Sequence, residues 1–287
     1  MRLREALETG AARLSAGPHP DRAKRDAETL LLHATGVPRA SLLAHDNDSL
    51  APELAVAFDA LIARRFAGEP IQQIIGETEF FGLTFRVTRD VLIPRPETEH
   101  LVERAIAIAQ HTPHPRIVDI GTGSGAIAVA LAHALPHAAV TTIDLSTAAL
   151  AVARDNATCN NVAERIRFLE GDLLAPVAPA GSEPEQFNLI VSNPPYVPET
   201  DRDSLAVEVR DFEPALALFA GANGLDIYRR LIPAAFAALV PDGALLLEIG
   251  YGQRDAIHAL LTAAGFVRIA FTPDLQGIPR VAEGWRP

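Results

Sequence analysis

The residues best suited to chemistry form a short loop, Asn193-Pro194-Pro195-Tyr196, shortly after the apolar run Leu189-Ile190-Val191. The run is typical of a buried strand in a parallel sheet, and two prolines forbid further ladder pairing. Because proline has no N–H and a fixed φ, the loop is stiff and offers carbonyl oxygens beside the Asn193 side-chain amide. Tyr196 adds a flat apolar face with a polar tip. Two acceptors and an aromatic wall match a planar –NH2 group whose nitrogen takes part in a reaction.

A second motif favours a ligand site over a simple turn, although the Asn-Pro pair alone fits a turn equally well. A strand pattern at 116–120 runs into Gly121-Thr122-Gly123-Ser124-Gly125, and a helical pattern at 126–135 follows. Glycines there permit positive φ and let backbone N–H groups approach a ligand at a helix N-terminus. The spacing is G-x-G-x-G, no lysine follows it, and Lys24 is the chain's one lysine. A phosphate-binding P-loop is therefore excluded.

Two acidic residues lie near this glycine loop. Asp144 ends the next predicted strand, 139–143, about 20 residues after the last glycine, which is where doubly wound folds bind ribose hydroxyls. Asp119 directly precedes the glycines. It is a candidate partner for the amine of an amino-acid moiety.

Together these residues resemble the class I S-adenosylmethionine-dependent methyltransferases, and the loop at 193–196 resembles the subgroup that methylates amide or exocyclic amino nitrogens. The resemblance implies an α/β fold with a Rossmann-like sheet of seven strands, the last antiparallel. It implies S-adenosyl-L-methionine as cofactor and S-adenosyl-L-homocysteine as product, with Asp172 similar to an adenine-amine contact. The residues expected to bind the cofactor are Asp119, Gly121, Thr122, Gly123, Ser124, Gly125, Asp144, Asp172, Leu173 and Asn193.

The segment 91–99, Val-Leu-Ile-Pro-Arg-Pro-Glu-Thr-Glu, resembles the signature of the HemK/PrmC family, the peptide chain release factor glutamine methyltransferases. By itself it is equally typical of an ordinary helix start, with Pro96 in the first turn and Glu97 near the positive helix end. The related ribosomal-protein glutamine methyltransferases have serine where Pro96 stands. Further segments that resemble the family lie at 210–218, 224–228 and 276–281.

The resemblance implies methyl transfer to the side-chain amide nitrogen, N5, of the glutamine in the Gly-Gly-Gln motif of release factors. This reaction is a protein methylation of factors that act in translation termination. An amide nitrogen is a poor nucleophile because its lone pair is delocalised. We expect the Asn193 oxygen and the Pro194 carbonyl to hold its two N–H groups and Tyr196 to form a wall, which makes these three residues the catalytic candidates. The expected substrate contacts are Asn193, Pro194, Pro195, Tyr196, Arg95, Pro96, Glu97 and Thr98.

Other functions remain open at this point. A nucleic-acid methyltransferase acting on N6 of adenine or N4 of cytosine presents the same kind of amino group after base flipping. The formal net charge of −11 disfavours it, because Lys and Arg supply most of the affinity for phosphates. A ribosomal-protein glutamine methyltransferase is a further alternative. The glycine spacing and the loop at 193–196 disfavour a dinucleotide-binding oxidoreductase or an inactive binding module.

The length of 287 residues indicates more than one domain. Residues 1–72 repeat apolar side chains at helical spacing, which predicts a helical domain for docking the substrate. The pattern of residues 73–93 predicts a linking β-hairpin that turns near Gly82. Residues 94–287 are expected to form the methyltransferase domain. Within the latter we expect a surface loop at 175–184, a helix at 226–240 and a strand at 244–249.

Cysteine, histidine and apolar content indicate the compartment of the protein and the partners that it can bind. A single cysteine, Cys159, excludes internal disulfides and favours a reducing, cytoplasmic compartment. The uncharged run 120–143 is long enough to span a bilayer, but its glycines and proline favour strand, turn, helix, turn and strand. His33 and His45 have no companion ligands at metal-site spacing, so no metal is expected. We expect a monomer that acts on a protein and binds neither nucleic acid nor membrane.

Overall fold

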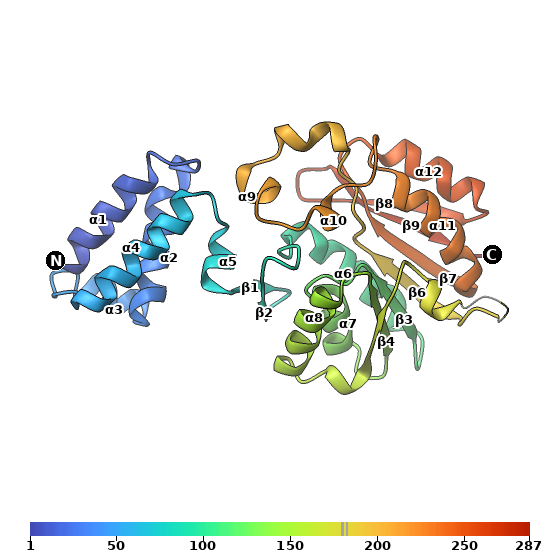
Figure 1. Cartoon of the computed structure of the whole chain (residues 1–287). Coiled ribbons are helices and arrows are strands. Elements are labelled where there is room, and N and C mark those ends of the chain that lie inside the picture. Colours follow the sequence, from blue (N-terminus) through green and yellow to red (C-terminus); the bar gives the residue numbers. More distant parts are fainter. Residues whose placement is uncertain (179–180, 182) are drawn as a thin grey trace. The chain divides into compact units, whose positions relative to one another are not determined.

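The computed structural model describes residues 1–178, 181 and 183–287. Residues 179, 180 and 182 of the predicted loop 175–184 lie outside the described residues. The chain forms two compact units, drawn in Figure 1. The helical unit comprises Met1–Glu77 and Leu205–Phe212, and the sheet unit comprises Thr78–Ser204 and Glu213–Pro287. The return of 205–212 to the helical unit has no counterpart in the sequence patterns.

The helical unit packs its helices around one apolar core, in which Leu30, Leu31 and Ile62 are buried. Burial of such side chains provides the main driving force for its folding. Helix α2 (Ala23–Thr35) is followed by Gly36, whose φ of 69° allows the left-handed cap that stops a helix. The helices of this unit are α1 (Leu3–Leu14), η1 (Pro20–Arg22), α2 (Ala23–Thr35), α3 (Arg39–Ala44), α4 (Pro52–Phe66), α5 (Ile71–Ile75) and α9 (Val207–Arg210).

Charged side chains fix the segment 205–212 within the helical unit. The Arg65 guanidinium donates to Glu208 at 3.0 Å and to Asp26 at 2.7 Å. The Gln73 amide also donates to the carbonyl of Phe212 at 3.1 Å. Arg65 and Asp26 are buried, and buried charges are tolerated when they are paired and hydrogen-bonded. The network therefore ties a late segment of the chain to the early helices.

The sheet unit contains a seven-stranded sheet in the order β5-β4-β3-β6-β7-β9-β8 (Figure 1). Strand β9 runs antiparallel to both of its neighbours, whereas the pairs from β5 to β7 are parallel. This confirms the predicted α/β fold with an antiparallel last strand. The strands are β3 (Arg116–Ile120), β4 (Ala139–Asp144), β5 (Ile166–Glu170), β6 (Phe187–Ser192), β7 (Leu239–Glu248), β8 (Val267–Pro273) and β9 (Pro279–Trp285).

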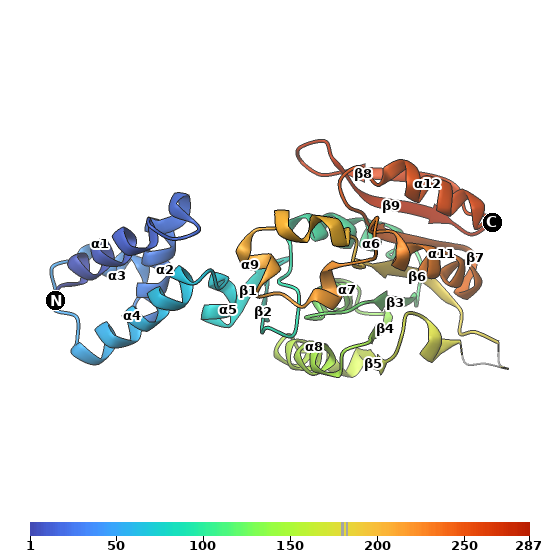
Figure 2. The same ribbon diagram turned by 45° about the horizontal axis from the view of Figure 1, so that its top comes forward.

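Helices cover both faces of this sheet, because alternate strand residues point to opposite sides. Ile117 and Leu189 pack with α6 (Glu99–Ala109) and α7 (Ala126–Ala134) on one face. Val118 and Ile190 pack with α11 (Asp226–Ala238) and α12 (Arg254–Ala263) on the other. Figure 2 shows α12 beside β8 and β9. The longer helices are α6 (Glu99–Ala109), α7 (Ala126–Ala134), α8 (Thr147–Cys159), α11 (Asp226–Ala238) and α12 (Arg254–Ala263). The short ones are η2 (Pro96–Thr98), η3 (Ala163–Arg165), η4 (Ala175–Val177), η5 (Glu199–Ser204) and α10 (Ala215–Leu218).

The hairpin of β1 (Glu77–Phe80) and β2 (Leu83–Arg86) confirms the predicted turn. Phe81 and Gly82 have φ values of 52° and 71°, and two positive φ values suit the right-handed twist of a tight hairpin.

The boundary between the helix expected at 226–240 and the strand expected at 244–249 differs from its prediction, because α11 ends at Ala238. Strand β7 begins at Leu239 rather than at 244, because Leu239 pairs with Phe187 across a register irregularity. Sequence periodicity alone does not reveal such an irregular pairing.

The uncharged run 120–143 forms the end of β3, the glycine loop, α7 and most of β4, as predicted. Across the part of the chain that the structure describes, no helix combines the length and the apolar character needed to cross a membrane.

Candidate active site

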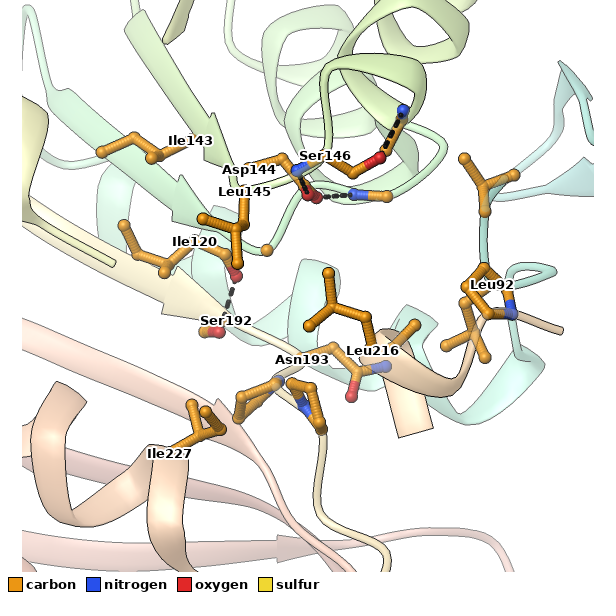
Figure 3. A pocket seen from close by; sticks show the side chains of 18 of the residues that line it. Leu92, Ile120, Ile143, Asp144, Leu145, Ser146, Ser192, Asn193, Leu216 and Ile227 are labelled. Carbon is orange, nitrogen blue, oxygen red and sulfur yellow. Dashed lines mark hydrogen bonds between the residues drawn. The ribbon is translucent and has the colours of Figure 1, made fainter. Parts of the chain in front are cut away.

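A cavity opens at the carboxyl ends of β3, β4 and β6 in the sheet unit (Figure 3). Its empty space of about 930 Å³ includes solvent at the open mouth. Doubly wound sheets bind ligands at this edge, outside the carboxyl ends of the strands. In Figure 3, Asp144 and Asn193 lie on different sides of the hollow, each at the end of its own strand. The strand ends therefore bring together the two motifs that the sequence singled out.

The glycine loop forms one wall of this cavity. Gly121 and Gly123 line it with φ values of 74° and 53°, and no atom lies within 4 Å of a Cβ built on either residue. A side chain there would fill the cavity. Gly125, with φ 83°, has a different role, because its Cβ would lie 3.0 Å from the Cβ of Ala153 on α8. The first two glycines leave room for a ligand, and the third lets α7 pack closely.

Asp144 lies at the cavity and fixes the glycine loop. Its Oδ2 accepts a hydrogen bond from the Gly123 N–H at 2.9 Å, and its Oδ1 accepts one from the Ser146 N–H at 2.8 Å. Both bonds are drawn in Figure 3. Each carboxylate oxygen has a second lone pair, so both retain capacity for a ligand hydroxyl.

Asp119 lies deeper, fully buried, and is not among the residues that line the cavity. Its Oδ2 accepts hydrogen bonds from the hydroxyls of Thr122 at 2.9 Å and Thr142 at 3.3 Å. Its Oδ1 has no hydrogen-bond partner among the described residues. Burial raises the pKa of Asp119 to about 7, and the nearby Asp144 adds to the rise. A buried carboxylate oxygen without a partner is rare, and it marks a place where a cationic ligand group would be stabilised.

Of the other residues predicted to bind the cofactor, some line the cavity and some are buried behind its wall. Asp172 and Leu173 line the cavity, and the Asp172 carboxylate pairs with Arg230. Thr122 and Ser124 are buried and do not line the cavity.

Several lining residues were missed by the sequence analysis. Leu145 and Leu216 are 53% and 57% exposed and present apolar surface to the cavity. Large exposed apolar side chains at a cavity favour an apolar ligand group. The sequence gives no signal for either leucine, because each stands in an ordinary apolar pattern.

Asn193, Pro194 and Pro195 form the opposite wall. The Asn193 Nδ2 donates to the Thr98 hydroxyl at 3.1 Å, and that hydroxyl donates to Glu248 Oε2 at 2.6 Å. No hydrogen bond reaches Asn193 Oδ1 from any residue that the structure describes. The side-chain nitrogen is thus held by Thr98, and the side-chain oxygen remains available as an acceptor.

Tyr196 lies beside this wall rather than in it. Its side chain does not line the cavity, and its hydroxyl donates to Glu248 Oε1 at 3.4 Å. Its carbonyl accepts a hydrogen bond from the Gln253 amide at 3.0 Å. Burial raises the pKa of Tyr196 above its ordinary value, so the phenol remains a hydrogen-bond donor. Tyr196 therefore supports the loop through Glu248 and Gln253.

Glu248 is a buried carboxyl group that the sequence analysis did not select. It ends β7 and is 2% exposed, and burial raises its pKa to about 7. The sequence does contain a feature that could have identified Glu248, namely an acidic residue near the end of an apolar strand. Asp144 was selected from the same kind of feature.

The segment 95–98 lies beside the loop at 193–196 and does not line the cavity. Arg95 pairs with the buried Glu213, and Pro96–Thr98 forms a single 3-10 turn. Thr98 is the member of this segment that contacts Asn193.

Solved methyltransferase structures resemble the chain in fold. The catalytic domain of hMettl16 in complex with the MAT2A 3'UTR hairpin 6 gives a TM-score of 0.58 at 18% identity, covering 81% of this chain and 81% of that chain. The ribosomal protein L11 methylase from Lactobacillus delbrueckii subsp. bulgaricus gives a TM-score of 0.51 at 23% identity. The match covers 71% of this chain and 86% of that chain. At these identities the likeness shows the fold alone.

Sequence relatives extend over the whole chain. The family model of the PrmC N-terminal domain matches residues 5–76, and that of the methyltransferase small domain matches 99–212. A release factor glutamine methyltransferase from Cereibacter sphaeroides is 46% identical over 287 residues, covering 100% of this chain and 99% of that protein. One from Koribacter versatilis is 40% identical with the same coverage. The chain therefore belongs to the family of release factor glutamine methyltransferases.

Proposed function

We propose that this protein transfers a methyl group from S-adenosyl-L-methionine to the side-chain amide nitrogen, N5, of the glutamine in the Gly-Gly-Gln motif of peptide chain release factors. The observation that carries the proposal is the unengaged Asn193 oxygen at the wall of the cavity, in a chain that matches release factor glutamine methyltransferases from end to end. The cofactor, S-adenosyl-L-methionine, supplies an electrophilic methyl group when bound.

The residues that line the cavity, together with Asp119 behind its wall, fit this cofactor. Asp119 has a buried oxygen without a partner among the described residues, which suits the ammonium group of the methionine moiety. The space beside Gly121 and Gly123 suits a ligand that approaches the backbone closely. Asp144 has lone pairs for ribose hydroxyls, and Leu145 offers apolar surface for the base.

We assign the remaining predicted cofactor residues to two roles. Asp172 and Leu173 would border the base, since both line the cavity. Thr122, Ser124 and Gly125 would shape the loop, because the first two are buried and the third packs against Ala153.

The stiff loop at 193–195 would hold the substrate amide. Asn193 Oδ1 and the Pro194 carbonyl accept the two N–H groups of the glutamine, while Pro195 keeps the loop rigid. Fixed orientation of this kind provides up to roughly 7–11 kcal/mol in favourable systems. No general base is required, because the nitrogen becomes acidic as it gains the methyl group.

The other predicted substrate contacts receive different parts in this proposal. Thr98 and Tyr196 fix the loop in position, Thr98 by accepting a hydrogen bond from Asn193 and Tyr196 by donating one to Glu248. Arg95, Pro96 and Glu97, which remain partly or fully exposed, would contact the body of the release factor.

The domain roles are also part of the proposal. The helical domain 1–72 docks the release factor, the hairpin 73–93 links the domains, and 94–287 carries the chemistry. The segment 205–212, which belongs to the helical unit, is the exception within the last range. We expect a monomer in the cytoplasm.

Methyl transfer to defined acceptors tests the proposed function. The enzyme is incubated with a labelled methyl donor and, separately, a release factor, the same release factor with its Gly-Gly-Gln glutamine changed to alanine, DNA, and ribosomal protein. Label should appear on the unaltered release factor alone. Label on DNA, or equal label on the altered release factor, would contradict the proposal.

Cofactor affinity should depend on pH through Asp119. Its pKa of about 7 in the free protein means that the carboxyl is mostly protonated at pH 5.5 and about half ionised at pH 7. An ammonium ligand requires the ionised form, so the affinity for S-adenosyl-L-homocysteine should rise roughly tenfold over this range by linkage. Asp119→Asn should bind more weakly and without this rise, as calorimetric titration would measure.

A matched control is Asp242→Asn, which alters an exposed acid of the same unit that pairs with Arg268. This variant should keep both the affinity and its dependence on pH. Equal affinity of the wild-type protein at pH 5.5 and 7 would rule out the assignment of Asp119.

A further inference from the structure

We infer that Glu248 is a positioning residue that determines, through Thr98, which end of the Asn193 side-chain amide faces the substrate. The inference deepens the proposed function and rests on it, because it concerns the acceptor that holds the glutamine amide.

The contacts form a continuous chain from the end of β7 to the cavity wall. Thr98 Oγ1 lies 2.6 Å from Glu248 Oε2 and 3.1 Å from Asn193 Nδ2. The Tyr196 hydroxyl donates to the other carboxylate oxygen at 3.4 Å. Glu248 and Thr98 are 2% and 4% exposed, so solvent has little access to replace either partner. In this interior each hydrogen bond therefore restricts the next.

The direction of these hydrogen bonds follows from the chemistry of a carboxylate. An ionised Glu248 can only accept, so Thr98 must give its one hydroxyl hydrogen to it. The Thr98 oxygen then has only lone pairs left, and Asn193 must turn its Nδ2 toward it. The Asn193 Oδ1 is thereby kept for the substrate. Without this constraint Thr98 could donate to Oδ1, and a flipped amide would meet the glutamine N–H groups with a donor.

Protonation of Glu248 removes the constraint. A neutral carboxyl has an O–H that can donate to Thr98, which frees the Thr98 hydrogen for Asn193 Oδ1. With Glu248 donating to Thr98, the buried Thr98 hydrogen has a partner only when Asn193 turns Oδ1 toward it, so the flipped amide becomes the favoured one. The same geometry that orients Asn193 at high pH therefore releases it at low pH.

The groups around Glu248 place this change near neutral pH. Burial raises its pKa to about 7 and Glu97 adds to the rise, while Thr98, Arg280 on β9 and Tyr196 oppose it. From α11, the Tyr228 hydroxyl donates to the backbone carbonyl of Glu248 at 2.6 Å. Burial raises the pKa of both tyrosines, so they remain neutral donors.

The test is the pH dependence of kcat between pH 6 and 8, with both the methyl donor and the release factor saturating. Saturation removes any contribution of Asp119 to donor binding. The wild-type kcat should be about tenfold lower at pH 6 than at pH 8, as expected for one group that titrates near 7. In Glu248→Gln the kcat at pH 8 should fall between about ten- and a hundredfold, because a misplaced contact group costs that much, and should no longer vary with pH.

Two changes at Thr98 separate positioning from a structural effect. Thr98→Val removes the hydroxyl and should lose both the rate and the pH dependence. Thr98→Ser retains the hydroxyl and should keep the wild-type profile. The matched control is Glu283→Gln on β9, which alters another buried carboxylate, paired with Arg104 at 2.6 and 2.9 Å, and should keep the pH dependence.

A flat wild-type profile, or a pH dependence that persists in Glu248→Gln or Thr98→Val, would overturn the inference. If thermal melting shows that Glu248→Gln does not fold, the Thr98 pair decides the question. The two failures are distinguishable. A wild-type protein that transfers no methyl group to the release factor refutes the proposed function, whereas transfer with unaltered profiles in these variants refutes only the role of Glu248.

Discussion

Replacement of Asn193 by alanine should lower kcat by roughly 10²–10³-fold, the cost of losing one group aimed in advance at the reacting centre. The glutamine amide would lose its side-chain acceptor and rotate more freely about the remaining contact with the Pro194 carbonyl. Binding of S-adenosyl-L-homocysteine should fall less, because Asp144 and the glycine loop lie on another side of the cavity. Steady-state kinetics with a release factor and calorimetric titration of the product measure the two effects separately.

The matched control for this variant lies on β6, the strand that precedes Asn193. Asn188, near the start of β6, accepts a hydrogen bond from the Arg116 N–H at 2.9 Å and does not line the cavity. Asn188→Ala should leave kcat near the wild-type value. Unchanged turnover in Asn193→Ala would remove the loop from the mechanism.

Replacement of Asp144 by alanine should weaken the affinity for S-adenosyl-L-homocysteine by roughly 10- to 100-fold, as expected for a charged hydrogen bond of about 1.5–3 kcal/mol. Two effects add here. The ribose loses its proposed acceptor, and Gly123 loses the carboxylate that holds its N–H at 2.9 Å. The kcat at saturating donor should change far less, because Asp144 forms hydrogen bonds with Gly123 and Ser146, on a different side of the cavity from Asn193.

Glu170 offers a matched control for Asp144. It ends β5 in direct register with Asp144, is exposed, and does not line the cavity. Glu170→Ala should bind the product with wild-type affinity. Wild-type affinity in Asp144→Ala as well, measured by the same titration, would contradict the ribose assignment.

The sequence by itself predicted most of the helices and strands along the chain, while the resemblance to known methyltransferases implied the seven-stranded sheet and the family. The predicted elements are local features, because apolar periodicity fixes which face of an element is buried, and glycine and proline fix where an element ends. The glycine loop and the loop at 193–195 were therefore found from residue types, and both line one cavity. The segment 91–99 indicated the family that the full-length relatives confirm.

The tertiary structure alone decided the contacts behind the site. Thr98 and Glu248 are 150 residues apart in sequence, and Thr98 and Asn193 are 95 apart. No periodic pattern specifies which of many acids meets which hydroxyl, since this depends on strand register and on the burial that long-range packing creates. The same packing places Tyr196 beside the cavity wall, whereas the sequence predicted it in the wall. It also buries the Glu248 carboxyl group, which raises its pKa. Residue types thus determine which chemistry is available, and the packing of distant segments determines how each group is oriented for it.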